Sequence, residues 1–119
     1  TTVEYEGGVE VARKILQSKS DITAVVATAD VMAIGMMKGF FEAGVKIPEQ
    51  ISIIGFDDLD ISKFMTPGLT TIRQPISQKG ERAVELLVEN IENPNMKKVD
   101  EIFPVELIER GSVAERKGK

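Results

Sequence analysis

The amino-acid sequence lacks the residue types on which many catalytic and metal sites depend. Its 119 residues include no cysteine and no histidine. Without cysteine there can be no disulfide bond, no thiolate nucleophile and no cysteine metal ligand. The absence of histidine removes the commonest general base and the commonest metal ligand. We therefore predict that the chain is not an enzyme, with no catalytic residues, no metal and no cofactor.

Two further kinds of sequence feature are missing. No apolar run is long enough to span a bilayer, and the N-terminal Thr1–Tyr5 has neither the basic nor the apolar region of a signal peptide. The 15 lysines and arginines are outnumbered by 19 aspartates and glutamates, and they are dispersed apart from Lys97–Lys98 and the C-terminal tail. Nucleic-acid binding normally needs a basic face. We predict neither membrane association nor DNA binding by these residues themselves.

The composition is that of a globular domain, with 42% hydrophobic and 29% charged residues. The length is sufficient for one modest core. Apolar residues recur at helical spacing in residues 8–18, 31–43 and 75–92. Short apolar runs without polar alternation, typical of strands buried on both faces, occupy residues 23–27 and 51–56. Residues 69–72 and 101–109 also have strand-like patterns, whereas residues 59–68 look irregular.

The alternation of strands and helices predicts right-handed βαβ units, and therefore an α/β fold with a parallel sheet flanked by helices as an αβα sandwich. Ligands of such sheets bind beyond the carboxyl ends of the strands. Those ends are Thr28–Asp30 and Asp57–Asp58. Asp30 also stands where an N-cap of the following helix is expected, and Gly44 where that helix should end.

Four sequence segments, taken in order, carry a resemblance to one family. They are Thr28–Gly35, Pro48–Asp58, Pro67–Pro75 and Arg110–Ser112. Together they resemble the effector-binding core of transcription regulators of the LacI/GalR type, which has the periplasmic-binding-protein type I fold. The combination of a Gly-Phe-Asp-Asp strand end with a Pro-Gly-Leu-Thr-Thr crossover makes the resemblance specific.

The resemblance implies a domain organisation. The family's core has two α/β subdomains hinged by three crossovers, with the effector between them. Residues 1–113 would form the C-terminal subdomain, except that residues 70–98 would cross over and complete the first subdomain of the parent. Residues 114–119 are read as a polar tail. The parent would bind DNA only through a helix-turn-helix headpiece, and this chain would supply one wall of the effector cleft and bind effector weakly at most.

The resemblance also implies site residues. Asp57 would accept hydrogen bonds from effector hydroxyls, and a carboxylate with several lone pairs and no donor suits a polyol. The alternative, capping of the next turn, is favoured for Asp58. Many relatives have an Asn-Asp pair before the helix, and its asparagine contacts the ligand. Ala29 stands in place of that asparagine, which argues against a simple hexose, and Asp30 matches the aspartate of the pair. Gln74 would contact ligand or form a hinge hydrogen bond, and the two roles are equally supported.

A homodimer is predicted from two surfaces. The resemblance implies a dimer interface formed by Ile34, Lys38, Phe41, Phe64 and Met65. In addition, the crossover segment would leave Leu86, Leu87 and Ile91 in water without a first subdomain to cover them. That segment either folds back onto its own domain or exchanges with a second copy.

The function predicted from these features is effector sensing and dimerisation within a cytoplasmic DNA-binding transcription regulator, with a sugar or other small molecule as effector. One alternative is a solute-binding protein of a sugar transporter, which shares the fold but seldom has the Pro-Gly-Leu-Thr-Thr crossover. The other is a phosphoacceptor receiver domain, which uses an Asp-Asp pair to hold magnesium. Receivers carry that pair on their first strand, and the nearest lysine here, Lys79, lies on a predicted helix.

Overall fold

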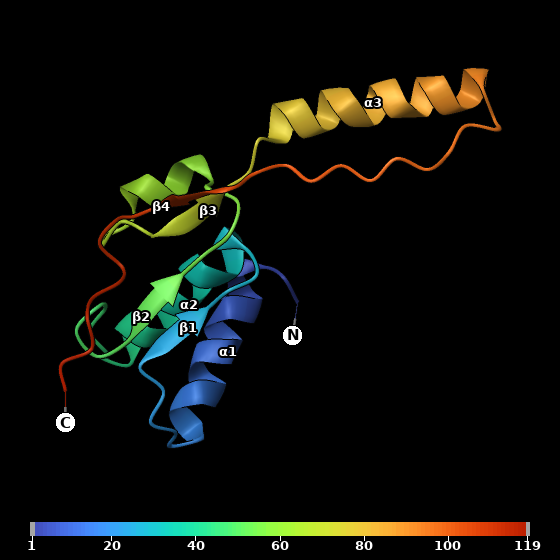
Figure 1. Ribbon diagram of the computed structural model, residues 1–119. Coiled ribbons are helices and arrows are strands. Elements are labelled where there is room, and N and C mark those ends of the chain that lie inside the picture. Colours follow the sequence, from blue (N-terminus) through green and yellow to red (C-terminus); the bar gives the residue numbers. More distant parts are fainter. Residues whose placement is uncertain (1, 119) are drawn as a thin grey trace. The chain divides into compact units, whose positions relative to one another are not determined.

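A computed structural model describes residues 2–118 of the chain (Figure 1). The chain divides into two compact units. The first unit is built from the residues before Gln74 together with those after Glu106, and the second unit is Gln74–Glu106. Within residues 2–118, no helix combines the length and the apolar character needed to cross a bilayer.

The first unit contains most of the secondary structure that the sequence predicts. Its elements are α1 (Tyr5–Gln17), β1 (Ala24–Val26), α2 (Asp30–Glu42), β2 (Ser52–Ile54), the 3-10 helix η1 (Asp60–Phe64), β3 (Thr71–Arg73) and the end of β4 (Glu106–Ile108). Three of the differences from prediction are local. Helix α1 begins earlier than residue 8, η1 occupies part of the segment read as irregular, and only Glu106–Ile108 of residues 101–109 forms a strand.

The predicted parallel pairing is present in the first unit between β1 and β2. Strands β1 and β2 pair in parallel with Val25 opposite Ile53. On the other side of β2, the Gly55 amide donates to the Thr70 carbonyl at 2.9 Å, and a parallel bridge joins Ile54 to Thr70. Strand β3 then pairs with β4. The carboxyl ends of β1, β2 and β3 consequently lie at one edge of the sheet.

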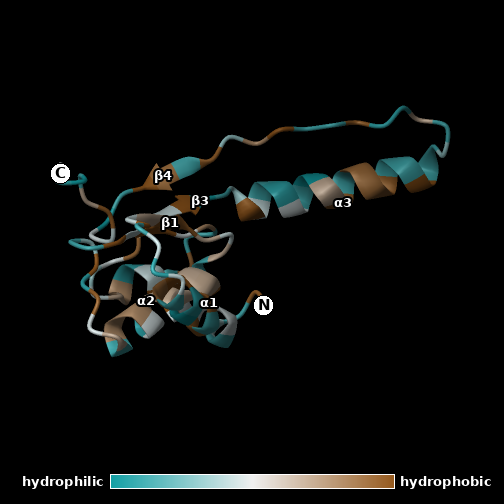
Figure 2. Ribbon diagram, turned by 90° about the horizontal axis from the view of Figure 1, so that it is seen from below, coloured by the Kyte–Doolittle hydropathy of each residue, from teal (hydrophilic) through white to brown (hydrophobic). Residues whose placement is uncertain are grey.

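Helices α1 and α2 pack closely on the same side of β1 (Figures 1 and 2). Gly8 and Gly35 make this approach possible, because a Cβ on Gly35 would overlap the Tyr5 carbonyl and one on Gly8 would overlap the Met32 carbonyl. The core beneath the helices includes the fully buried side chains of Phe40, Met36, Ile53 and Leu69. Removing these apolar side chains from water stabilises the first unit by roughly 1.5–3 kcal/mol for each large residue.

The prediction that residues 23–27 are buried on both faces is wrong for β1. Val25 packs against the core, whereas Val26 is 75% exposed and Ala24 is exposed as well. Successive residues of a strand point to opposite faces, and Val25 is on the face that packs against the core residues of α1 and α2. Strand β2 is buried as expected, with Ile53 inaccessible.

The second unit consists of α3 (Ile76–Glu92) and the returning segment 93–105, which run side by side (Figure 1). Arg82 links them, with Nε 2.5 Å from Oε1 of Glu101. None of the residues of α3 is buried, and Leu87 is 62% exposed. The apolar side chains that the sequence predicted to need a partner are therefore still accessible in this chain. The assignment of residues 70–98 to a first subdomain stays a prediction.

Candidate ligand-binding site

The two polar strand ends meet at the carboxyl edge of the sheet, which is where the sequence predicted a site. The amide of Asp30 donates to the carbonyl of Phe56 at 2.8 Å, which ties the start of α2 to the end of β2. The amide of Asp57 donates to the carbonyl of Ile72 at 2.9 Å, which ties the same strand end to β3. The backbone around Asp57 is thus fixed on one side by the start of α2 and on the other by β3.

Asp57 has a strained backbone. Its φ angle is 116°, which is rare for any residue other than glycine, and Asp58 follows with φ 53°. Aspartate tolerates the left-handed region of Asp58 better than most residues do, but the conformation of Asp57 costs about 1–3 kcal/mol. Strain of this kind persists only where the surrounding structure enforces it, and it is concentrated at functional sites. Asp57 is half-buried at this edge.

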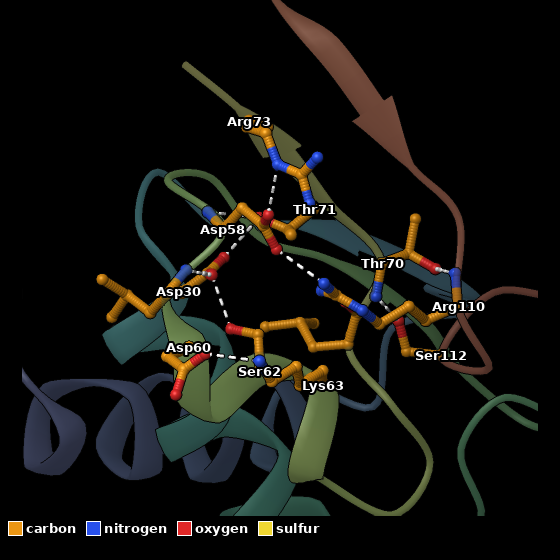
Figure 3. A network of polar contacts seen from close by, with 12 residues as sticks. Asp30, Asp58, Asp60, Ser62, Lys63, Thr70, Thr71, Arg73, Arg110 and Ser112 are labelled. Atoms are coloured by element: carbon orange, nitrogen blue, oxygen red, sulfur yellow. Dashed lines mark hydrogen bonds and ion pairs between the residues drawn. The ribbon is translucent and has the colours of Figure 1, made fainter. Parts of the chain in front are cut away.

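The Asp58 carboxylate lies between two arginines (Figure 3). Oδ1 is 2.7 Å from Nη2 of Arg110, and Oδ2 is 2.7 Å from Nε of Arg73. Burial raises the pKa of Asp58, but the hydrogen bonds and charges of Arg110 and Arg73 outweigh it, so the pKa lies below its usual range. The donors to the Asp58 carboxylate are these two arginines and not an amide of the following turn, so the structure replaces the predicted turn-capping role with an ion-pair role.

The Asp30 side chain has a different role from the predicted one. It is inaccessible to solvent and accepts hydrogen bonds from the Leu59 amide at 2.8 Å, the Ser62 hydroxyl at 2.6 Å and the Thr71 hydroxyl at 2.5 Å. The N-cap of α2 is Ala29, without a side-chain capping bond. Asp30 is therefore no helix cap, and a buried carboxylate with both oxygens engaged is not available to a ligand. Ala29 remains beside the site and is 9% exposed.

Gly55 is required by the Asp30 carboxylate. A Cβ at this position would overlap Oδ1 of Asp30 and lie 3.0 Å from Cδ2 of Leu69. We expect Gly55→Ala to lower the free energy of unfolding by about 1–3 kcal/mol, the usual cost of overfilling a packed interior. Urea denaturation followed by circular dichroism measures it. Gly80→Ala is the matched control, because a Cβ on Gly80 meets nothing within 4 Å. Equal stabilities of the two variants would contradict the expected overlap.

Gln74, the remaining predicted ligand contact, belongs to the second unit. Its Oε1 accepts a hydrogen bond from Nζ of Lys79 at 2.8 Å. The ligand role and the hinge role both stay predictions for this residue. Within residues 2–118, aspartates and glutamates do not gather in a group of three or more that could hold a metal ion.

A second feature of the first unit is an open groove of about 700 Å³. Four of the five residues predicted for a dimer interface line it: Ile34, Lys38, Phe41 and Met65. The fifth, Phe64, does not line the groove but is 72% exposed. Sequence reasoning missed several other lining residues, among them Tyr5, Ile47 and Pro67.

Arg73 and Arg110 are the site residues that sequence reasoning overlooked. In the sequence, Arg110 is part of an Arg-Gly-Ser segment and Arg73 is part of the crossover, and neither segment by itself indicates a role for its arginine. Neither arginine is marked by a charge pattern in its own segment of the sequence, since Arg110 follows Glu109 and Arg73 stands between Ile72 and Gln74. Their pairing with Asp58 joins segments 15 and 52 residues apart, which no local pattern reveals.

A parallel sheet with polar side chains gathered at its carboxyl edge defines an α/β ligand-binding domain. This chain belongs to the periplasmic-binding-protein-like domain family, whose sequence profile matches residues 2–113. The family membership confirms the predicted fold class and contradicts the receiver-domain alternative.

Within that class, the chain is similar to regulators of the LacI type, as the sequence indicated. It is 36% identical over 110 residues to the ribose operon repressor of Escherichia coli strain K12, covering 92% of this chain and 33% of the repressor. It is 46% identical over 114 residues to the transcriptional repressor PurR of Pasteurella multocida, covering 95% of this chain and 34% of that protein. The chain thus spans about a third of the length of these curated relatives.

The crystal structure of a LacI family transcriptional regulator from Enterococcus faecalis V583 with bound ribose is also similar. It has a TM-score of 0.89 and 41% sequence identity, and the match covers 98% of this chain and 43% of that one. The resemblance to LacI-type regulators is therefore confirmed both in sequence and in structure.

Proposed function

We propose that this chain is the effector-sensing and dimerisation part of a LacI/GalR-type transcription regulator, and that its effector is a sugar-like small molecule. The observation that carries the proposal is Asp57, held with φ 116° at the carboxyl end of β2. The parent regulator would act in the cytoplasm, would bind DNA through a separate headpiece, and would perform no catalysis. The ribose-bound relative supports the class of effector.

The charges around Asp57 do not favour an anionic ligand. Asp58 pairs with both Arg73 and Arg110, so both arginines are already engaged by a carboxylate. Asp57 offers hydrogen-bond acceptors and no donor, which suits vicinal hydroxyl groups. We infer that the side chain of Asp57 receives hydrogen bonds from sugar hydroxyls.

The test uses D-ribose as the probe and this chain as the protein. Two-dimensional NMR titration should give chemical-shift changes at the strand ends, with a weak affinity because one wall of the cleft is present. Asp57→Asn should weaken binding by about 10–100-fold, since a hydrogen bond to a charged group contributes about 1.5–3 kcal/mol. Asp60→Asn is the control, because Asp60 is an exposed residue whose carboxylate pairs with Lys63 at the surface. Equal affinities for the two variants would overturn the role of Asp57.

Dimerisation is proposed to occur through the groove lined by Ile34, Lys38, Phe41 and Met65. The groove is mostly apolar, and Phe41 beside it is 81% exposed. A second copy could cover both by an arrangement in which the same surface of each copy meets the other.

A further inference from the structure

Asp58 is tied to the two chain segments that connect the first unit with the second. Arg73 is the last residue before the second unit begins at Gln74, and Arg110 follows closely after the chain re-enters the first unit at Leu107. Both arginines hydrogen-bond to the same carboxylate, each at 2.7 Å and each to a different oxygen (Figure 3). One side chain therefore holds both the departing and the returning segment.

Further hydrogen bonds hold Arg110 and the backbone of Asp58 in place. Arg110 donates from Nη1 to the Leu69 carbonyl at 2.8 Å, and its backbone amide donates to the Thr70 hydroxyl at 2.9 Å. The amide of Asp58 donates to the Thr71 hydroxyl at 3.3 Å. That hydroxyl donates in turn to the buried carboxylate of Asp30. The turn that carries Asp57 is therefore fastened through both the backbone and the side chain of its neighbour.

The two arginine contacts differ in their exposure to water. The side chains of Asp58 and Arg110 are 9% and 17% exposed, whereas that of Arg73 is 53% exposed. Solvent screens the Arg73 pair more strongly, so the Arg110 pair should be the stronger of the two.

We propose that Asp58 is a positioning residue for the effector site, which through Arg73 and Arg110 holds the strained turn of Asp57 to both connecting segments. The proposal rests on the proposed function in taking Asp57 as the effector contact. An effector that moves Asp57 then acts on the arginines of both segments through one bridging carboxylate, without needing any contact of its own with them.

Amide hydrogen exchange in this chain, measured by NMR, tests the positioning without any effector. Asp58→Asn removes the charge but keeps a residue that tolerates the left-handed backbone. Protection of the Asp57 amide, which donates to the Ile72 carbonyl, should fall about tenfold, the size of one lost charge-assisted hydrogen bond. Protection of the Ile53 amide, which donates to the Ser112 carbonyl, should remain within about twofold.

Three comparisons make this test specific. Asp60→Asn, a matched loss of one carboxylate charge at the surface, should leave the protection of both amides unchanged. Arg110→Gln should reduce the protection of Asp57 more than Arg73→Gln does, because the Arg110 pair is better shielded. A uniform loss of protection across the first unit, or an unchanged Asp57 amide in Asp58→Asn, would overturn the proposal.

A pH titration of the Arg73 Nε–H signal distinguishes the bridging role of Asp58 from a general contribution to stability. The pKa of Asp58 lies below its usual range, so its carboxylate stabilises the fold above that range, and this stabilisation is lost as pH falls through the lowered value. The Nε–H signal of Arg73 should titrate together with the Asp58 carboxyl, and Asp58→Asn should abolish that titration. An Arg73 signal that ignores the protonation of Asp58 would contradict the bridge. If the wild-type chain did not bind ribose, while Asp58→Asn still changed amide exchange as expected, the proposed function would be overturned and the positioning role of Asp58 would stand.

Discussion

Replacing Asp30 with alanine is expected to lower the free energy of unfolding by about 3–5 kcal/mol. The buried carboxylate is the acceptor for the Leu59 amide and for the hydroxyls of Ser62 and Thr71. A buried donor left without an acceptor costs about 1–3 kcal/mol. The two hydroxyls can rotate toward other acceptors, so the total stays below the sum of three such losses, but the Leu59 amide is fixed by its backbone.

Urea denaturation measures this difference, and fluorescence of Tyr5 reports on the first unit because Tyr5 is the single tyrosine of a chain without tryptophan. Asp60→Ala is the matched control, since the Asp60 side chain is 84% exposed and its loss should change stability by less than about 0.5 kcal/mol. Asp30→Asn keeps the shape and one acceptor oxygen and should fall between the two. If Asp30→Asn matched the wild type, the three-donor account of Asp30 would be wrong.

The sequence predicted the elements whose causes are local. The apolar spacing in residues 31–43 and the glycine after them set the extent of α2, and Gly44 has a φ of 75°, which favours glycine at a helix end. The continuous apolar runs of residues 23–27 and 51–56 predicted parallel pairing, and β1 and β2 form that pair. Because parallel strands bring their carboxyl ends together, the location of the candidate site followed from the same pattern.

The roles of individual acids could not be predicted in the same way. An N-cap is a local pattern, whereas the actual partners of Asp30 are 29, 32 and 41 residues away. Likewise, Asp58 follows a strand where a turn cap is common, yet one of its arginines is 52 residues distant. The exposed face of β1 has a similar origin. An apolar run shows that a strand can be buried on both faces, but which face is covered depends on where the helices pack.

Self-association is expected to depend on Phe41. Its side chain is 81% exposed beside the groove that Ile34, Lys38 and Met65 help to line. Burying a large apolar side chain contributes about 1.5–3 kcal/mol, and a two-fold arrangement counts each such residue twice. We expect the chain to sediment as a dimer at tens of micromolar, the range in which an interface of standard size is occupied. Phe41→Asp should then yield monomers, because two carboxylates would be placed in an apolar interface.

The matched control for Phe41→Asp is Leu87→Asp, which places the same charge on an exposed apolar residue of α3. If the groove is the interface, Leu87→Asp remains dimeric in analytical ultracentrifugation, while the dissociation constant of Phe41→Asp rises by at least about 30-fold, as for a central interface residue. The reverse pattern, with only Leu87→Asp dissociating, would mean that the second unit exchanges between copies and that the groove is not the contact. A wild-type chain that is monomeric at tens of micromolar would refute both association through the groove and exchange of the second unit. Both modes require a second copy to cover the exposed apolar side chains.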